Sequence, residues 1–255
     1  MSGHSKWATI KHKKGAADKA RGKLFAKLIR QVEVAAREGG GDPDANPTLR
    51  SMFAKARESS VPLDTIERAI KRGTGELEGV HYEQVSYEGY APSGVAVIVE
   101  CLTDNRNRTG PDIRATFSKN GGSMAEPGAV AWQFERKGVI LVPAHPEGGA
   151  EVSEDDLMLV ALEAGAEDIS ESGEGWQVTT PPSDLTAVRA ALEEAGIVID
   201  SAEATMLATT TVPLDSETDA KKVLRLIDLL EDHDDVQNVY ANFDIPDAIL
   251  ELVEA

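Results

Sequence analysis

The sequence predicts a multi-domain α+β fold. We expect an N-terminal three-helix domain followed by two α/β domains, ferredoxin-like or related, with the last inserted into the middle one. Apolar residues recur at helical spacing near the N-terminus, and runs typical of strands alternate with helical segments after it. The 255 residues, 41% of them hydrophobic, are also more than one typical domain needs.

The first expected helix spans residues 18–38. Leu24, Leu28 and Val32 recur at every fourth position and would form one buried stripe. Gly39 begins a glycine-rich turn that should end the helix.

Two further helices complete the expected helical domain. Asn46 and Pro47 supply a cap and a first-turn proline for the second helix. The third should begin near Pro62 and end before Gly73, and the sequence of residues 64–67 resembles a capping box. Three amphipathic helices can bury one small core.

After about residue 80 the pattern changes to that of an α/β domain. The continuous apolar run of residues 95–99 predicts a strand covered on both faces, with Cys101 buried at its end. A helix near residues 110–120 and a strand over residues 129–134 should follow.

Residues 138–206 show the order strand, helix, strand, strand, helix, strand, which is typical of a ferredoxin-like unit. The two helices should begin at the N-caps Ser153 and Ser183. The expected strands are Val139–Val142, Ala166–Ser170, Trp176–Thr179 and Ile197–Ser201.

A last helix and strand, containing Val223 to Leu230 and Val239 to Phe243, remain after this unit. We expect them to complete the sheet that begins near residue 80. The predicted domains are therefore 1–78, then 79–136 together with 207–250, and the inserted 137–206.

Charge is distributed very unevenly along the chain. The net charge is −18, yet residues 1–75 carry 16 Lys and Arg against 8 Asp and Glu. The other 180 residues carry 10 against 36. Since the Debye length is about 8 Å at physiological salt, the basic region should attract polyanions despite the overall charge.

The sequence favours a cytoplasmic monomer without a membrane partner. A single cysteine cannot form an intramolecular disulfide, which favours a reducing compartment. No secretory signal is apparent, and no stretch approaches the roughly 20 apolar residues of a membrane span. A lysine-rich transit peptide in residues 1–30 is the alternative.

The basic opening is the strongest candidate binding site. Lysines can neutralise phosphates, and a tryptophan among them can stack on an unpaired base. The alternative is a solvated basic tail whose tryptophan packs on the helical domain. The predicted nucleic-acid-binding residues are Lys6, Trp7, Lys11, His12, Lys13, Lys14, Lys19, Arg21, Lys23 and Lys27.

A second candidate is the polar segment Asn105, Arg106, Asn107, Arg108 and Thr109, which leads into a predicted helix. Helix N-termini attract anions, and two arginines there could hold a phosphate or a partner. Equally, both arginines could pair with nearby acidic residues.

No enzyme motif is present. The sequence lacks a phosphate-binding GxxxxGK[ST], a GxGxxG, an HExxH and a paired CxxC, and Ser123 lies in an imperfect GxSxG. His4 and His12 have no further ligand at metal spacing. We therefore expect no catalytic residue, no metal and no cofactor.

Several long motifs closely resemble those of the YebC/PmpR family, and the resemblance runs essentially end to end. That family includes the mitochondrial translational activator of cytochrome oxidase subunit I. The matching segments are Gly3–Trp7, Ile10–Lys14, Tyr87–Tyr90, Glu100–Thr109 and Asn120–Gly122. The turn after Tyr90 departs from the family, where relatives often have more glycine.

The resemblance implies three domains, no enzymatic activity and a nucleic-acid-facing role for the run from Lys6 to Lys14. Family members are described both as DNA-binding transcriptional regulators and as ribosome-associated factors. Because no recognition helix is evident, we expect ribosomal RNA as the target, with the ribosome as a further partner and DNA bound nonspecifically. An adaptor that binds proteins through the acidic α/β domains is the alternative.

Overall fold

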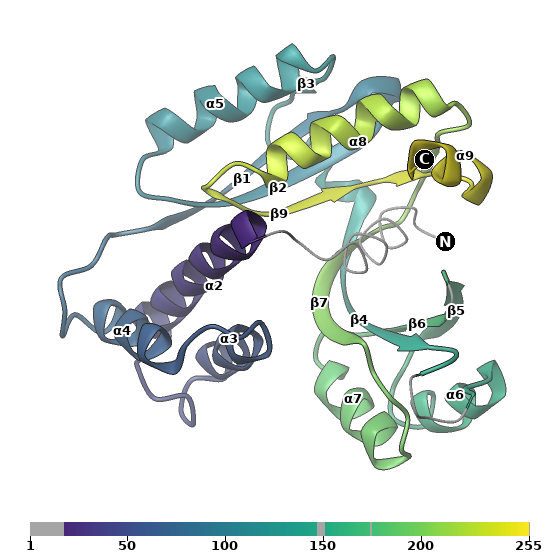
Figure 1. Cartoon of the computed structure of the whole chain (residues 1–255), viewed down its shortest axis with the longest axis horizontal. Helices are drawn as coiled ribbons and strands as arrows, with labels where there is room; N and C mark the ends of the chain where they lie inside the picture. The colour runs from purple at the N-terminus through teal and green to yellow at the C-terminus, as the bar shows by residue number, and fades with distance from the viewer. Residues whose placement is uncertain (1–17, 147–150, 174, 255) are drawn as a thin grey trace.

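The structure is a computed structural model that describes residues 18–146, 151–173 and 175–254. The chain forms a helical N-terminal part, a first sheet covered by helices and a second sheet with its own two helices (Figure 1). The fold is α+β and multi-domain with a helical N-terminal region, which confirms the predicted class.

The N-terminal part consists of α2 (Asp18–Gly39), α3 (Pro47–Glu58) and α4 (Leu63–Gly73). The Asn46 side chain accepts a hydrogen bond from the Leu49 amide, as the cap prediction requires. The capping box predicted at residues 64–67 is wrong, because α4 begins at Leu63 and its N-cap, Pro62, has no side-chain donor or acceptor. The buried core is Leu28, Val32, Ala35, Ala36, Leu49, Ala56, Val61, Ile66 and Ala69.

The first sheet has the strand order β3-β1-β2-β9. Its strands are β1 (Glu83–Tyr90), β2 (Ala96–Thr103), β3 (Ser123–Met124) and β9 (Val236–Ala241). β9 pairs with β2 although more than a hundred residues separate them, so the last part of the chain returns to the sheet that β1 begins. β1 was not predicted as a strand, because its alternation is weak and one face is only half-buried.

Helices cover one face of this sheet. α5 (Arg106–Lys119) and α8 (Glu217–Glu231) lie side by side over it, and α9 (Asp247–Glu254) packs on α8 (Figure 1). Phe117, Leu226 and Phe243 are among the fully buried side chains of this core. A two-stranded parallel ladder joins β8 (Val212–Pro213) to β10 (Phe243–Asp244).

The second sheet has the order β5-β6-β4-β7 and is antiparallel throughout. Its strands are β4 (Phe134–Pro143), β5 (Asp168–Ser172), β6 (Gly175–Thr180) and β7 (Ser201–Ala208), and its helices are α6 (Glu154–Ala161) and α7 (Leu185–Glu194). Numbered within this unit, the strand order is 2-3-1-4, which is the ferredoxin-like arrangement expected from the order of elements.

Local predictions in this region were partly wrong. The strand expected over residues 129–134 is a 3-10 turn, Ala131–Gln133, after which β4 runs without a break to Pro143. Ser153 is the N-cap of α6, as predicted, and takes part in a capping box, but the N-cap of α7 is Asp184 rather than Ser183. The strand expected over Ile197–Ser201 is also displaced, because β7 spans Ser201–Ala208. The domain boundaries themselves stay a prediction.

Candidate nucleic-acid interface

The predicted binding residues fall into two groups. Six of them lie outside the described residues: Lys6, Trp7, Lys11, His12, Lys13 and Lys14. The other four lie on α2: Lys19, Arg21, Lys23 and Lys27. The nucleic-acid role of all ten stays a prediction, but the environment of Lys23 and Lys27 is described.

Lys23 and Lys27 contact the end of α8. The Lys23 ammonium donates to the Asp232 backbone oxygen at 2.9 Å and forms an ion pair with the Asp232 carboxylate. The Lys27 ammonium donates to the Glu231 backbone oxygen at 2.7 Å. Both lysines therefore connect the basic helix to the first-sheet domain.

Arg30 continues this contact one turn further along α2. Its guanidinium donates to the Asp234 backbone oxygen and lies 3.4 Å from an oxygen of the Asp235 carboxylate. It also lies 5.5 Å from the centre of the Tyr82 ring, at cation–π distance.

Helix geometry explains why these three cations act together. Residues 23, 27 and 30 are spaced by four and three positions, so they project from one face of α2. They meet the C-terminal end of α8, where unpaired carbonyls carry partial negative charge and the residues that follow are acidic. We call this contact the α2–α8 contact.

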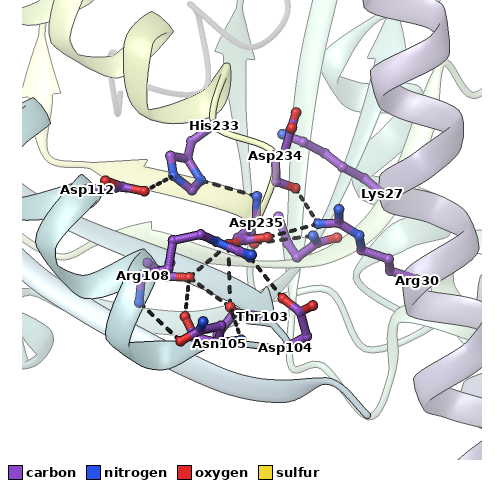
Figure 2. A network of polar contacts seen from close by, with 12 residues as sticks. Lys27, Arg30, Thr103, Asp104, Asn105, Arg108, Asp112, His233, Asp234 and Asp235 are labelled. Carbon is purple, nitrogen blue, oxygen red and sulfur yellow. Dashed lines mark hydrogen bonds and ion pairs between the residues drawn. The ribbon is translucent and has the colours of Figure 1, made fainter. Parts of the chain in front are cut away.

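Asp235 is the centre of a buried polar network next to this contact (Figure 2). Its side chain is only 5% exposed. One carboxylate oxygen accepts from the Arg108 guanidinium at 2.8 Å and from the Thr109 hydroxyl at 2.7 Å. The Thr103 and Thr109 hydroxyls are 2.7 Å apart, which ties β2 to the start of α5.

The protonation of Asp235 follows from these partners. Burial alone would raise the pKa of its carboxyl group, but the hydrogen bonds from Arg108 and Thr109 and the charges of Arg108 and Arg30 outweigh burial and lower the pKa. Asp235 therefore remains a carboxylate at neutral pH, and it holds Arg30 of the basic helix and Arg108 of α5 at one site.

The second candidate segment forms the start of α5. Asn105 is the N-cap, and its side chain accepts from the Arg108 amide. Arg108 also pairs with Asp104 at 2.9 Å, while Arg106 lies 3.7 Å from Glu83. Both arginines thus have acidic partners, whereas the Arg106, Asn107 and Arg108 side chains are still solvent-exposed. A role of this segment in holding phosphate or a partner stays a prediction.

Sequence analysis named Lys23 and Lys27 as candidate binding residues, but it identified neither Arg30 nor the acidic residues that hold these cations. The run from Asp232 to Asp235 follows α8 directly and contains three carboxylates and His233. An acidic cluster at the end of a helix, in a chain with one basic helix, was a usable signal for charge pairing. The pairing could not be assigned from sequence, since about 200 residues separate the basic and acidic partners.

The central cleft has a volume of about 840 Å³ and is lined by α2, α3, both sheets and α8. Lys55 of α3 spans it to Glu203 of β7 at 2.8 Å. Cations and acids both line the walls, including Arg136, Glu100 and Asp228. This mixture does not favour a simple anion, so the cleft by itself does not define a phosphate site.

The described residues contain neither a metal-binding cluster nor a reactive thiol. They hold no group of three or more His, Cys, Asp or Glu side chains placed to bind a metal ion. Burial raises the pKa of the Cys101 thiol to about 12, so it is not a thiolate at neutral pH.

No helix among the described residues has the length and apolar character needed to cross a membrane.

Fold and site together define a class of protein: a basic helical domain held by ion pairs on an acidic α/β body. Comparison with known proteins gives the class a family. Residues 5–76 match the TACO1/YebC protein N-terminal domain, and residues 82–243 match the TACO1/YebC second and third domain. The chain belongs to the TACO1/YebC family.

Individual relatives match most or all of the chain. A protein of Saccharopolyspora erythraea is 59% identical and one of Thermobifida fusca is also 59% identical, with 98% or more of each chain covered. Both are named "Probable transcriptional regulatory protein". The crystal structure of a conserved hypothetical protein from Aquifex aeolicus is 49% identical, with a TM-score of 0.78 over 89% of this chain and 91% of that one.

Proposed function

We propose that the protein is a non-enzymatic, nucleic-acid-binding regulator of gene expression that binds ribosomal RNA through its basic N-terminal region. The observation that carries this proposal is the charge separation, with an excess of 8 positive charges in residues 1–75 and of 26 negative charges in the rest. Phosphate is attracted to one end of such a molecule and repelled by the other.

The α2–α8 contact bears on the choice between RNA and DNA. A sequence-specific DNA reader usually inserts a free recognition helix into the major groove. The cationic face of α2 instead packs against the end of α8, with Lys23 and Arg30 paired to acidic residues. This arrangement supports binding through the opening segment to RNA rather than groove reading by α2.

The test is a comparison of ribosome binding between two triple variants. Substituting Lys11, Lys13 and Lys14 by glutamate should abolish co-sedimentation with ribosomes and binding to protein-free ribosomal RNA. The control replaces Lys119, Lys221 and Lys222 of the α/β body by glutamate, which changes the net charge equally. Equal binding by both variants would overturn the proposal.

DNA is the second candidate target, favoured by the names of the two relatives. Specific DNA binding should give a footprint that survives about 0.2 M salt with competitor DNA, whereas nonspecific phosphate contacts weaken steeply over that range. An adaptor that uses only its acidic domains would keep full activity in the Lys11, Lys13 and Lys14 variant.

A further inference from the structure

The outer face of α6 exposes apolar side chains that the fold does not use. Leu159 is 71% exposed, Leu162 46% and Met158 41%. Positions 158, 159 and 162 are neighbours on a helix surface, so these side chains form one patch. We call it the α6 patch.

The α6 patch is not the core-facing side of the helix. Leu157 and Ala161 are fully buried and pack with Val178 and Leu192 in the core of the second sheet. A helix on the surface of a globular protein normally has polar residues opposite its buried stripe. α6 is apolar on two sides, and one of them has no partner among the described residues.

Acidic residues surround the α6 patch. Glu154 and Asp155 lie four positions before Met158 and Leu159, and Glu163 lies four positions after Leu159, so all three border the same face. They are exposed.

The wider environment is acidic as well. Residues 137–206 contain 15 Asp and Glu but only two basic residues, Lys137 and Arg189. Lys137 pairs with Glu135 and Glu167, and Arg189 pairs with Glu193. The negative field around the α6 patch therefore has little local compensation.

We propose that the α6 patch docks a basic, amphipathic segment of a protein partner, whose apolar side chains cover Leu159 and its neighbours while Lys or Arg residues face the acidic rim. Charge complementarity selects this occupant. The same field repels nucleic acid and anionic membranes, and two copies of the patch would repel each other.

The α6 patch lies apart from the basic helix α2. α6 lies at the edge of the second-sheet domain, far from α2 (Figure 1). A polyanion bound along α2 would therefore leave α6 accessible to protein. A target that carries both phosphate groups and a basic protein surface can therefore contact α2 and the α6 patch at the same time. Because three side chains form a small contact, the docking should be readily reversible.

The direct test is a titration of the full chain with a fluorescent amphipathic helical peptide of leucine and lysine, followed by anisotropy. Leu159→Glu should weaken binding about tenfold, because it places a charge in the apolar centre of the contact. The control is Leu252→Glu on α9, another exposed leucine in an acidic surrounding, which should change affinity by less than about twofold. Equal effects of the two substitutions would overturn the proposal.

The rim and the partner class are tested separately. The triple variant E154Q, D155N and E163Q should weaken the peptide about tenfold as well, and a leucine–glutamate peptide should not bind. In cells, p-benzoylphenylalanine at position 159 should crosslink to a Lys- and Arg-rich protein segment, and the adduct should disappear in the triple variant. Adducts to nucleic acid or to a second copy of the chain, or no adduct, would refute the proposal.

This inference does not depend on the proposed function. Substituting Lys11, Lys13 and Lys14 by glutamate should leave peptide affinity within about twofold of the unmodified chain, since the side chains that define the α6 patch and its acidic rim all belong to residues 154–163. Failure of RNA binding and failure of α6 docking are therefore separate results.

Discussion

Asp235→Asn tests whether the polar network at the start of α5 is primarily structural. The substitution keeps the size of the side chain and removes its charge. Arg108 and Thr109 both donate to the same oxygen of Asp235, at 2.8 and 2.7 Å, and Arg30 approaches the other oxygen at 3.4 Å. An amide at this position can accept only through its carbonyl oxygen, so it cannot satisfy both sides.

The expected loss follows from these contacts. A hydrogen bond to a charged group contributes about 1.5–3 kcal/mol. The bond from Thr109 is fully buried and should count in full, while Arg108 is 48% exposed and regains water when it loses its partner. We therefore expect Asp235→Asn to lower the free energy of unfolding by about 2–4 kcal/mol at pH 7.

The loss should depend on pH in a defined direction. The pKa of Asp235 is lowered in the folded protein, so its carboxylate contributes stability above the unfolded pKa of about 3.9. That contribution is lost as the pH falls through the folded pKa. The stability difference between the two proteins should stay constant from about pH 5 to 7 and shrink below about pH 4.

Urea denaturation followed by circular dichroism at several pH values measures both effects. Asp234→Asn is the matched control, because Asp234 is exposed and only its backbone oxygen accepts from Arg30. It should change stability by less than about 0.5 kcal/mol. If Asp235→Asn were no more destabilising than this control at pH 7, the structural role of the network would be refuted.

Three other predictions concern stability and reactivity. Gly73→Ala should lower the free energy of unfolding, measured by heat or urea, by about 1–3 kcal/mol, because its Cβ would lie 2.4 Å from the Glu33 backbone oxygen. Gly22→Ala should instead stabilise α2 by about 0.5–1 kcal/mol, because nothing lies within 4 Å of the added Cβ. Asn46→Ala should cost about 1–3 kcal/mol, since the cap and two further hydrogen bonds disappear. Cys101, fully buried with its thiol pKa raised to about 12, should resist Ellman's reagent at pH 8 until urea unfolds the protein.

The parts of the fold that sequence predicted are those where local signals agree. In α3, the Asn46 cap, the following proline and the apolar spacing all point to the same helix. In the second sheet, the order of elements with two helices defined the ferredoxin-like unit. Each element of these predictions was identified from residues that are close together in the chain.

The parts that sequence missed depend on distant partners. β1 is held between β2 and β3, and its own residues alternate too weakly to identify it. Residues 129–134 were predicted as a strand, but they form a turn before β4. The Glu88 carboxylate holds this turn because it accepts hydrogen bonds from the Val130 and Ala131 amides. The α2–α8 contact likewise joins residues that share no local pattern.

The α2–α8 contact makes a quantitative prediction for nucleic-acid binding. Nine basic side chains lie in residues 1–30, but Lys23, Lys27 and Arg30 donate to the residues at the end of α8. If that contact persists in the complex, at most six remain to neutralise phosphates. The logarithm of the affinity should then fall against the logarithm of salt with a slope of about −4 for single-stranded RNA, or about −5 for duplex DNA.

Release of α2 from α8 on binding would instead engage all nine and give slopes of about −6 and −8. A filter-binding titration over a range of KCl concentrations separates the two cases. Substituting Lys23 and Lys27 by glutamine then tests whether these two lysines contribute to the slope. With the contact intact, that double substitution leaves the slope unchanged, because neither lysine displaces counterions from the nucleic acid. A slope that becomes shallower by about 1.4 for single-stranded RNA, or by about 1.8 for duplex DNA, would show that α2 leaves α8 to bind phosphate.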